Sequence, residues 1–68
     1  MTSQKTDRVR FKYVALLRRW DVIVDGEGAG YIYQHYDGRW WYTPDGLEQK
    51  LYDAYCNGIK RKVRALWP

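Results

Sequence analysis

The sequence has few of the features that would stabilise or anchor a chain of 68 residues. It has one cysteine, Cys56, which excludes an internal disulfide and fits a reducing compartment. No apolar run approaches the roughly 20 residues of a membrane span, and residues 1–6 lack the apolar segment of a signal peptide. We therefore expect a cytoplasmic chain without membrane contact, with a flexible leader over residues 1–6 and a single globular domain over residues 7–68.

Catalytic and metal-binding patterns are also missing. The segment Asp25-Gly26-Glu27-Gly28 is too short for a calcium loop, and no Lys-Ser/Thr follows the glycines as it would in a phosphate-binding loop. His35 and Cys56 could pair as base and nucleophile, but their spacing gives no support for this, and a packing role suits both. The sequence predicts no metal site, no cofactor and no enzymatic activity.

Charge is sorted along the chain. Residues 1–19 carry six basic side chains against one acid, residues 20–57 carry seven acids against two basic side chains, and residues 58–68 carry four basic side chains and no acid. Sorting of this kind favours a binding protein with one positive and one negative surface.

The first half of the chain has the pattern of strands and turns. Strict alternation from Arg8 to Tyr13 predicts a strand, although a helical spacing also fits this segment. Further strands are expected over residues 20–24, 31–36 and 39–43. A glycine-rich turn over residues 25–30 separates the first two of these, and Asp37-Gly38 is typical of a two-residue hairpin turn. Together these segments predict an antiparallel β-meander.

The second half predicts one helix. Leu47, Leu51 and Tyr55 recur at helical spacing, which indicates a helix over residues 45–57. Residues 59–67 fit either a strand or a helix, and the strand is favoured because Asn57-Gly58 resembles a helix end. The expected fold is α+β, with a small antiparallel sheet of three to five strands and one helix packed on a face. The expected core comprises Val9, Phe11, Trp20, Val22, Val24, Leu47, Leu51, Tyr55 and Val63.

Basic side chains at both ends suggest a first function. If both ends are strands lying side by side, their cationic rows would form a stripe at roughly the spacing of nucleic-acid phosphates. The alternative is that they are solvated faces that protect edge strands. We favour nucleic-acid binding, DNA or RNA, with phosphate contacts from Arg8, Arg10, Lys12, Lys60, Lys62 and Arg64.

Aromatic residues support the same function. The chain has four tryptophans, seven tyrosines and one phenylalanine, more large rings than so small a core can hold. One face of the hairpin over residues 31–43 is expected to be paved by rings, from Tyr31, Tyr33 and His35 on one strand and Trp40 and Tyr42 on the next. We interpret this face as the core under the helix, with stacking on unpaired bases as the alternative. The exposed candidates for stacking are then Tyr36 and Trp41, with Arg39 beside them.

The acidic middle supports a second hypothesis, in which the chain binds a protein. Acidic turns are usually only solvated, but the same residues could dock on a basic partner. Such a module would resemble the small inhibitors and adaptors that phages and other mobile genetic elements encode, and it could form a homodimer. Its interface would comprise Asp21, Asp25, Glu27, Tyr36 and Trp41.

Three short features are similar to known families. The segment Arg10-Phe11-Lys12-Tyr13 resembles the first strand of small archaeal chromatin proteins, which are basic SH3-like barrels with a C-terminal helix. Trp40-Trp41 after an Asp-Gly turn resembles a stretch of SH3 domains. Three strands followed by a helix also resemble the architecture of DNA-reading domains in some integrases. No functional residue is carried over from these resemblances.

Overall fold

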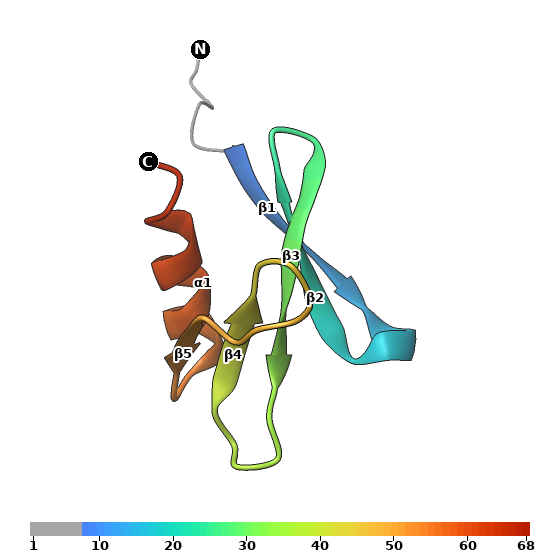
Figure 1. Ribbon diagram of the computed structural model, residues 1–68, viewed down its shortest axis with the longest axis vertical. Coiled ribbons are helices and arrows are strands. Elements are labelled where there is room, and N and C mark those ends of the chain that lie inside the picture. Colours follow the sequence, from blue (N-terminus) through green and yellow to red (C-terminus); the bar gives the residue numbers. More distant parts are fainter. Residues whose placement is uncertain (1–7) are drawn as a thin grey trace.

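The computed structural model describes residues 8–68, which form a five-stranded antiparallel sheet and one α-helix (Figure 1). The strand order is β1-β2-β3-β4-β5, so each strand pairs with its neighbours along the chain. The predicted α+β meander is confirmed, whereas the leader predicted over residues 1–6 lies outside the described residues. The elements are β1 Val9–Val14, β2 Arg19–Val24, β3 Glu27–Gln34, β4 Trp40–Thr43, β5 Leu51–Asp53 and α1 Cys56–Arg64.

The first hairpin, β1 and β2, confirms the strand reading of the N-terminal segment. Its register runs from the pair Val9 and Val24 to the pair Val14 and Arg19. A short 3₁₀ turn, Ala15–Leu17, connects the two strands.

A helix that spans a membrane must be long and apolar, and residues 8–68 contain none that is long and apolar enough.

The tight two-residue turn lies between β2 and β3. Asp25 and Gly26 both have positive φ, 52° and 86°, as a type I′ hairpin turn requires. The hairpin predicted at Asp37-Gly38 is confirmed, because β3 and β4 pair across it. Its turn is not the predicted two-residue type, since residues 35–39 connect the strands and only Gly38 has positive φ. Because the turn at Asp25 and Gly26 takes only two residues, residues 27–30 begin β3 instead of forming a loop.

The helix predicted over residues 45–57 is wrong. Residues 44–50 form a connection without a helix, and Leu51 pairs with Tyr42 to start β5. The real helix, α1, covers most of the segment for which a strand was favoured. Its Ile59 and Val63, one helical turn apart, are both completely buried, which explains why this segment is helical. Asn57 and Gly58 therefore lie inside the first turn of α1 and do not end a helix.

The core lies between the sheet and α1. It consists of Val9, Val22, Val24, Ile32, Tyr42, Ile59 and Val63. The prediction is confirmed for Val9, Val22, Val24 and Val63, and Phe11, Trp20 and Leu51 pack partly buried against this core. It is wrong for Leu47 and Tyr55, which are 85% and 74% exposed because the predicted helix does not exist.

Alternation along the strands gives the sheet two different faces. Val22, Ile32 and Tyr42 point toward α1, and we call their side of the sheet the covered face. The residues between them point the other way, onto a side that no helix of residues 8–68 covers, which we call the open face. The connection over residues 44–50 touches part of the open face, where the Gln49 side chain donates a hydrogen bond to the Tyr33 hydroxyl.

Candidate functional site

A row of side chains crosses the open face from β2 to β5. Arg19 pairs with Tyr33, Tyr33 with Trp41, and Trp41 with Tyr52. Cross-strand partners share a face and neighbouring strands lie about 4.8 Å apart, so these side chains stand side by side. The Trp41 and Tyr52 ring centroids are 5.0 Å apart at an interplanar angle of 38°. We call Tyr33, Trp41 and Tyr52 the aromatic row.

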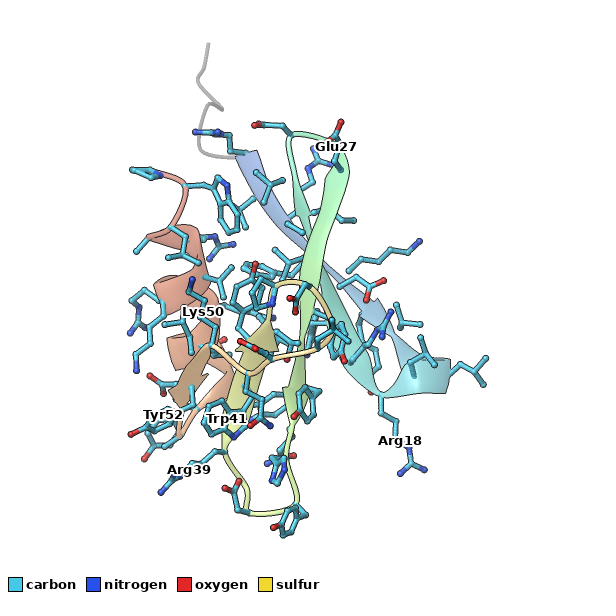
Figure 2. All side chains as sticks on the ribbon, viewed as in Figure 1. Arg18, Glu27, Arg39, Trp41, Lys50 and Tyr52 are labelled. Carbon is cyan, nitrogen blue, oxygen red and sulfur yellow. The ribbon has the colours of Figure 1, made fainter. Side chains whose placement is uncertain are left out.

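Arginines lie at both ends of the aromatic row. The Arg39 guanidinium lies 5.0 Å from the centre of the Tyr52 ring, and Figure 2 shows Arg39, Trp41 and Tyr52 gathered in one region. At the other end Arg19 lies 4.2 Å from the centre of the Tyr31 ring. The row therefore combines flat apolar surface with positive charge, a combination that attracts anions carrying aromatic groups.

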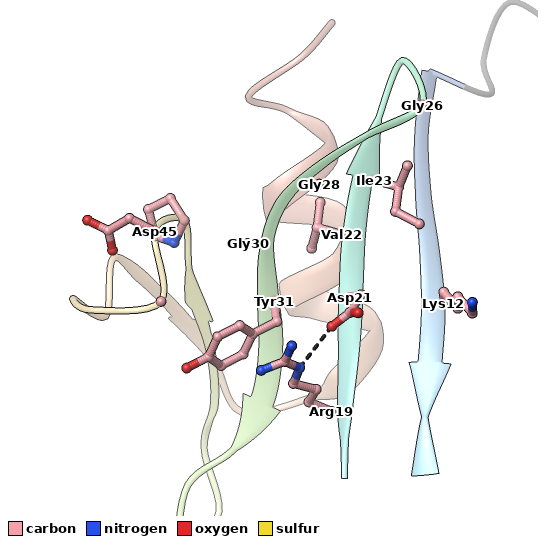
Figure 3. Close-up of a pocket in the computed structure, with 12 residues that line it drawn as sticks. Lys12, Arg19, Asp21, Val22, Ile23, Gly26, Gly28, Gly30, Tyr31 and Asp45 are labelled. Atoms are coloured by element: carbon pink, nitrogen blue, oxygen red, sulfur yellow. Dashed lines mark hydrogen bonds and ion pairs between the residues drawn. The ribbon is translucent and has the colours of Figure 1, made fainter. Parts of the chain in front are cut away.

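An open groove lies beside Arg19 and Tyr31, at the Arg19 end of the row (Figure 3). Lys12 lines it on β1, and Asp45 lines it on the connection after β4. Gly28 and Gly30 of β3 also line it, so no side chain from these positions fills it. Backbone N–H groups of Leu47 and Glu48 bind the Asp45 carboxylate and lower its pKa, which keeps this acid charged. An Arg19–Asp21 ion pair, with an N–O distance of 2.9 Å, lies at the same groove.

The cations of β1 fall into two groups. Arg10 and Lys12 are exposed on the open face and form no ion pair within residues 8–68. Arg8 is held by an ion pair of 3.1 Å with Asp25, and its guanidinium also donates a hydrogen bond to the Pro68 carbonyl. The two ends of the described chain therefore lie side by side, as expected, but Arg8 is already engaged.

The second cationic row predicted for the C-terminal segment does not form, because the segment is helical. Lys60 and Arg64 project from α1 toward the covered face, where the Lys60 ammonium lies 3.4 Å from the centre of the Trp20 ring. Lys62 lies on another side of α1 and forms an ion pair of 3.3 Å with Asp53. The six predicted cations therefore do not form one stripe.

The assignment of rings to faces was wrong for β3 and correct for β4. Tyr31, Tyr33 and His35 were expected to face the helix, but Ile32 does, which leaves Tyr33 on the open face. On β4, Tyr42 faces the helix and Trp41 the open face, as expected. Tyr33 was therefore missed, although the apolar Ile32, the residue of β3 best suited to a core, could have indicated its face. Tyr52 was missed because it was assigned to the predicted helix over residues 45–57. Tyr36 is 94% exposed, but it lies at the β3–β4 turn against His35 and outside the aromatic row.

The residues of the protein-binding alternative are not brought together. Glu27 and Trp41 lie at different ends of the long axis of the molecule (Figure 2). Asp21 and Asp25 are each paired with an arginine. Within residues 8–68, no group of three His, Cys, Asp or Glu side chains is placed to hold a metal ion.

Comparison with known proteins adds no family. No protein-family model, no curated protein and no solved structure matches this chain.

Proposed function

We propose that the protein is a non-enzymatic module that binds single-stranded nucleic acid on the open face of its sheet. Bases stack on the aromatic row, and phosphates contact the cations around it. The observation that carries the proposal is the alignment of Tyr33, Trp41 and Tyr52 across three neighbouring strands, on the open face of the sheet.

The rings favour unpaired bases over a duplex. Rings on adjacent strands offer apolar surface at intervals of about 4.8 Å, and an extended single strand can place successive bases on them. Each base stacked on an aromatic side chain contributes about 1–3 kcal/mol. A duplex keeps its base faces stacked on each other and presents only its backbone and base edges. The aromatic row therefore favours a single strand.

The cations support binding of the backbone. Arg10 and Lys12 lie on the same face of the sheet as the row, and Arg39 lies over Tyr52 at its far end. A chain of phosphates that follows the bases across the strands meets positive charge at both ends of its path. Because phosphate contacts release counterions, affinity falls as salt rises, by a factor that grows with the number of contacts.

The experiment is a titration of a fluorescently labelled single strand of about 10 nucleotides, followed by anisotropy. The wild type binds the strand more tightly than a duplex of the same sequence. Trp41→Ala and Tyr52→Ala each weaken binding by about 5-fold to 100-fold, as the loss of one stacked base predicts.

Tyr55→Ala is the matched control for Tyr52→Ala. Tyr55 is 74% exposed and precedes α1, outside the aromatic row, so its removal leaves affinity unchanged. A wild type that binds no single strand, or a Trp41→Ala variant that binds as tightly as the wild type, contradicts the proposal. Affinity that does not change between about 50 and 200 mM salt contradicts the phosphate contacts.

A further inference from the structure

The hairpin of β1 and β2 ends in an exposed apolar turn. Leu16 is 92% exposed and Leu17 is 54% exposed, and Tyr13 at the end of β1 is 51% exposed. Figure 1 shows this turn projecting from the side of the molecule away from α1. Adjacent exposed leucines on a projecting turn form an apolar patch of the kind that marks an interaction site.

The turn is held rigidly. An unbroken ladder of residue pairs leads up to it, and the Arg18 N–H closes it with a hydrogen bond of 3.1 Å to the Ala15 carbonyl. Next to the turn, the rings of Tyr13 on β1 and Trp20 on β2 lie 5.0 Å apart, and the Lys60 ammonium of α1 lies over the Trp20 ring. The hydrogen bonds and ring contacts of the hairpin therefore hold the two leucines in place at its end.

Charge around the turn selects an anionic partner. Arg18 and Arg19 directly follow the leucines in the chain, and Lys12 lies on β1 two residues before that strand ends. Arg18 points away from the sheet in Figure 2. The only acid within residues 8–24 is Asp21, which is paired with Arg19. The partner must therefore combine negative charge with an apolar interior that leucines can enter.

Among anionic partners with an apolar interior, the position of the turn favours nucleic acid. Leu17, Arg18 and Arg19 line a groove together with Tyr33, the first ring of the aromatic row. A strand leaving the row at Tyr33 would reach the leucines next. Apolar side chains flanked by arginines are known to enter base steps and unstack them. The leucines lie at the end of this path, where they could unstack bases in this way.

We infer that Leu16 and Leu17 act as a wedge, which enters the base stack where a single strand meets a duplex and opens the duplex end. The inference rests on the proposed function, because the aromatic row must hold the released strand. No covalent step and no energy source is involved. Opening is driven by binding, since a protein that holds only the unpaired state shifts the equilibrium toward it.

The test uses a forked DNA duplex with a fluorophore and a quencher at the fork, with protein in excess. The double variant Leu16→Ser/Leu17→Ser lowers the ratio of open to closed forks about tenfold relative to the wild type. It binds an isolated single strand as the wild type does. Leu16→Met/Leu17→Met keeps the opening, because methionine is also an apolar wedge.

Leu47→Ser is the matched control. Leu47 is an 85% exposed leucine on the connection between β4 and β5, and its removal leaves fork opening unchanged. Circular dichroism spectra of all variants match the wild type, because the changed side chains lie outside the core.

The failures of the two proposals are distinguishable. If the wild type binds no single strand, the proposed function fails first. If it binds single strands but opens no fork, or if the double variant opens forks as well as the wild type, the wedge alone is overturned. The wedge is also overturned if the double variant loses single-strand affinity and fork opening in equal measure. A last assay measures binding to phosphatidylglycerol vesicles. If the double variant loses vesicle binding but opens forks as the wild type does, the turn is assigned to a lipid surface and the wedge is overturned.

Discussion

The two faces of the sheet use similar side chains for different purposes. Tyr42 on the covered face is 1% exposed, its hydroxyl donates a hydrogen bond to the Ala29 carbonyl, and its burial raises its pKa. Its neighbour Trp41 points to the open face, where its ring meets Tyr52. The difference teaches that α1, and not residue type, decides which rings stabilise the fold and which are free to bind.

Cations on the two sides differ in the same way. Lys60 and Arg64 lie over the rings of Trp20 and Phe11 and shield the edge of the core. Arg10 and Lys12 form no ion pair within residues 8–68. Binding therefore depends less on the number of positive charges in a segment than on the face of the sheet that their side chains occupy.

The sharpest comparison is between Ile32 and Tyr33, adjacent residues on opposite faces. Ile32 is completely buried, so Ile32→Ala lowers the free energy of unfolding by about 2–5 kcal/mol in urea denaturation. Tyr33→Ala lowers it less, but weakens binding of a single strand by about fivefold or more. The division into two faces is wrong if Tyr33→Ala proves the more destabilising or leaves binding intact.

The second comparison, between the cations on the two sides of the sheet, is expected to show an effect of moderate size. Removing the two open-face cations of β1, Arg10→Ala/Lys12→Ala, reduces the slope of log affinity against log salt by about 1.4, since each phosphate contact to a single strand contributes about 0.7. Lys60→Ala/Arg64→Ala leaves the slope unchanged and costs about 0.5–1 kcal/mol of stability for each lost contact with a ring. Equal effects of the two pairs on the slope would show that both sides of the sheet bind phosphate.

The smallest expected effect concerns pH. The Tyr55 backbone N–H, assisted by Lys62, lowers the pKa of Asp53 below its usual 3.8. A folded-state pKa below the unfolded one stabilises the fold above about pH 4, and this contribution is lost as the pH falls through the folded value. Asp53→Asn therefore shows a weaker fall of Tm in acid than the wild type. An identical fall in both proteins would contradict this role for Asp53.

Much of the sheet was predictable from sequence because strand and turn signals are local. Alternation in residues 8–13 and the Asp-Gly pairs each specify a strand or a turn without reference to the rest of the chain. The helix was not predictable in this way, because two apolar repeats compete for it. Leu47, Leu51 and Tyr55 fit a helix as well as Ile59 and Val63 do, and only packing against the sheet decides between them.

The candidate site was predictable only in part, because a shift of one residue in register moves every side chain to the other face. Arg10, Lys12, Arg39 and Trp41 were nominated from sequence, and the fold places them on or at the edge of the open face. Tyr52 was assigned to a helix that does not exist, so its pairing with Trp41 was out of reach. Whether any of these residues binds nucleic acid stays a prediction.

The order of the elements also has a consequence for synthesis in the cell. All five strands precede α1 in the chain, and each pairs with the next, so the contacts of the sheet are short-range and can form early. Until α1 leaves the ribosome, a nascent meander exposes the apolar side chains that this helix later buries. Slow emergence of α1 would prolong that exposure and favour aggregation.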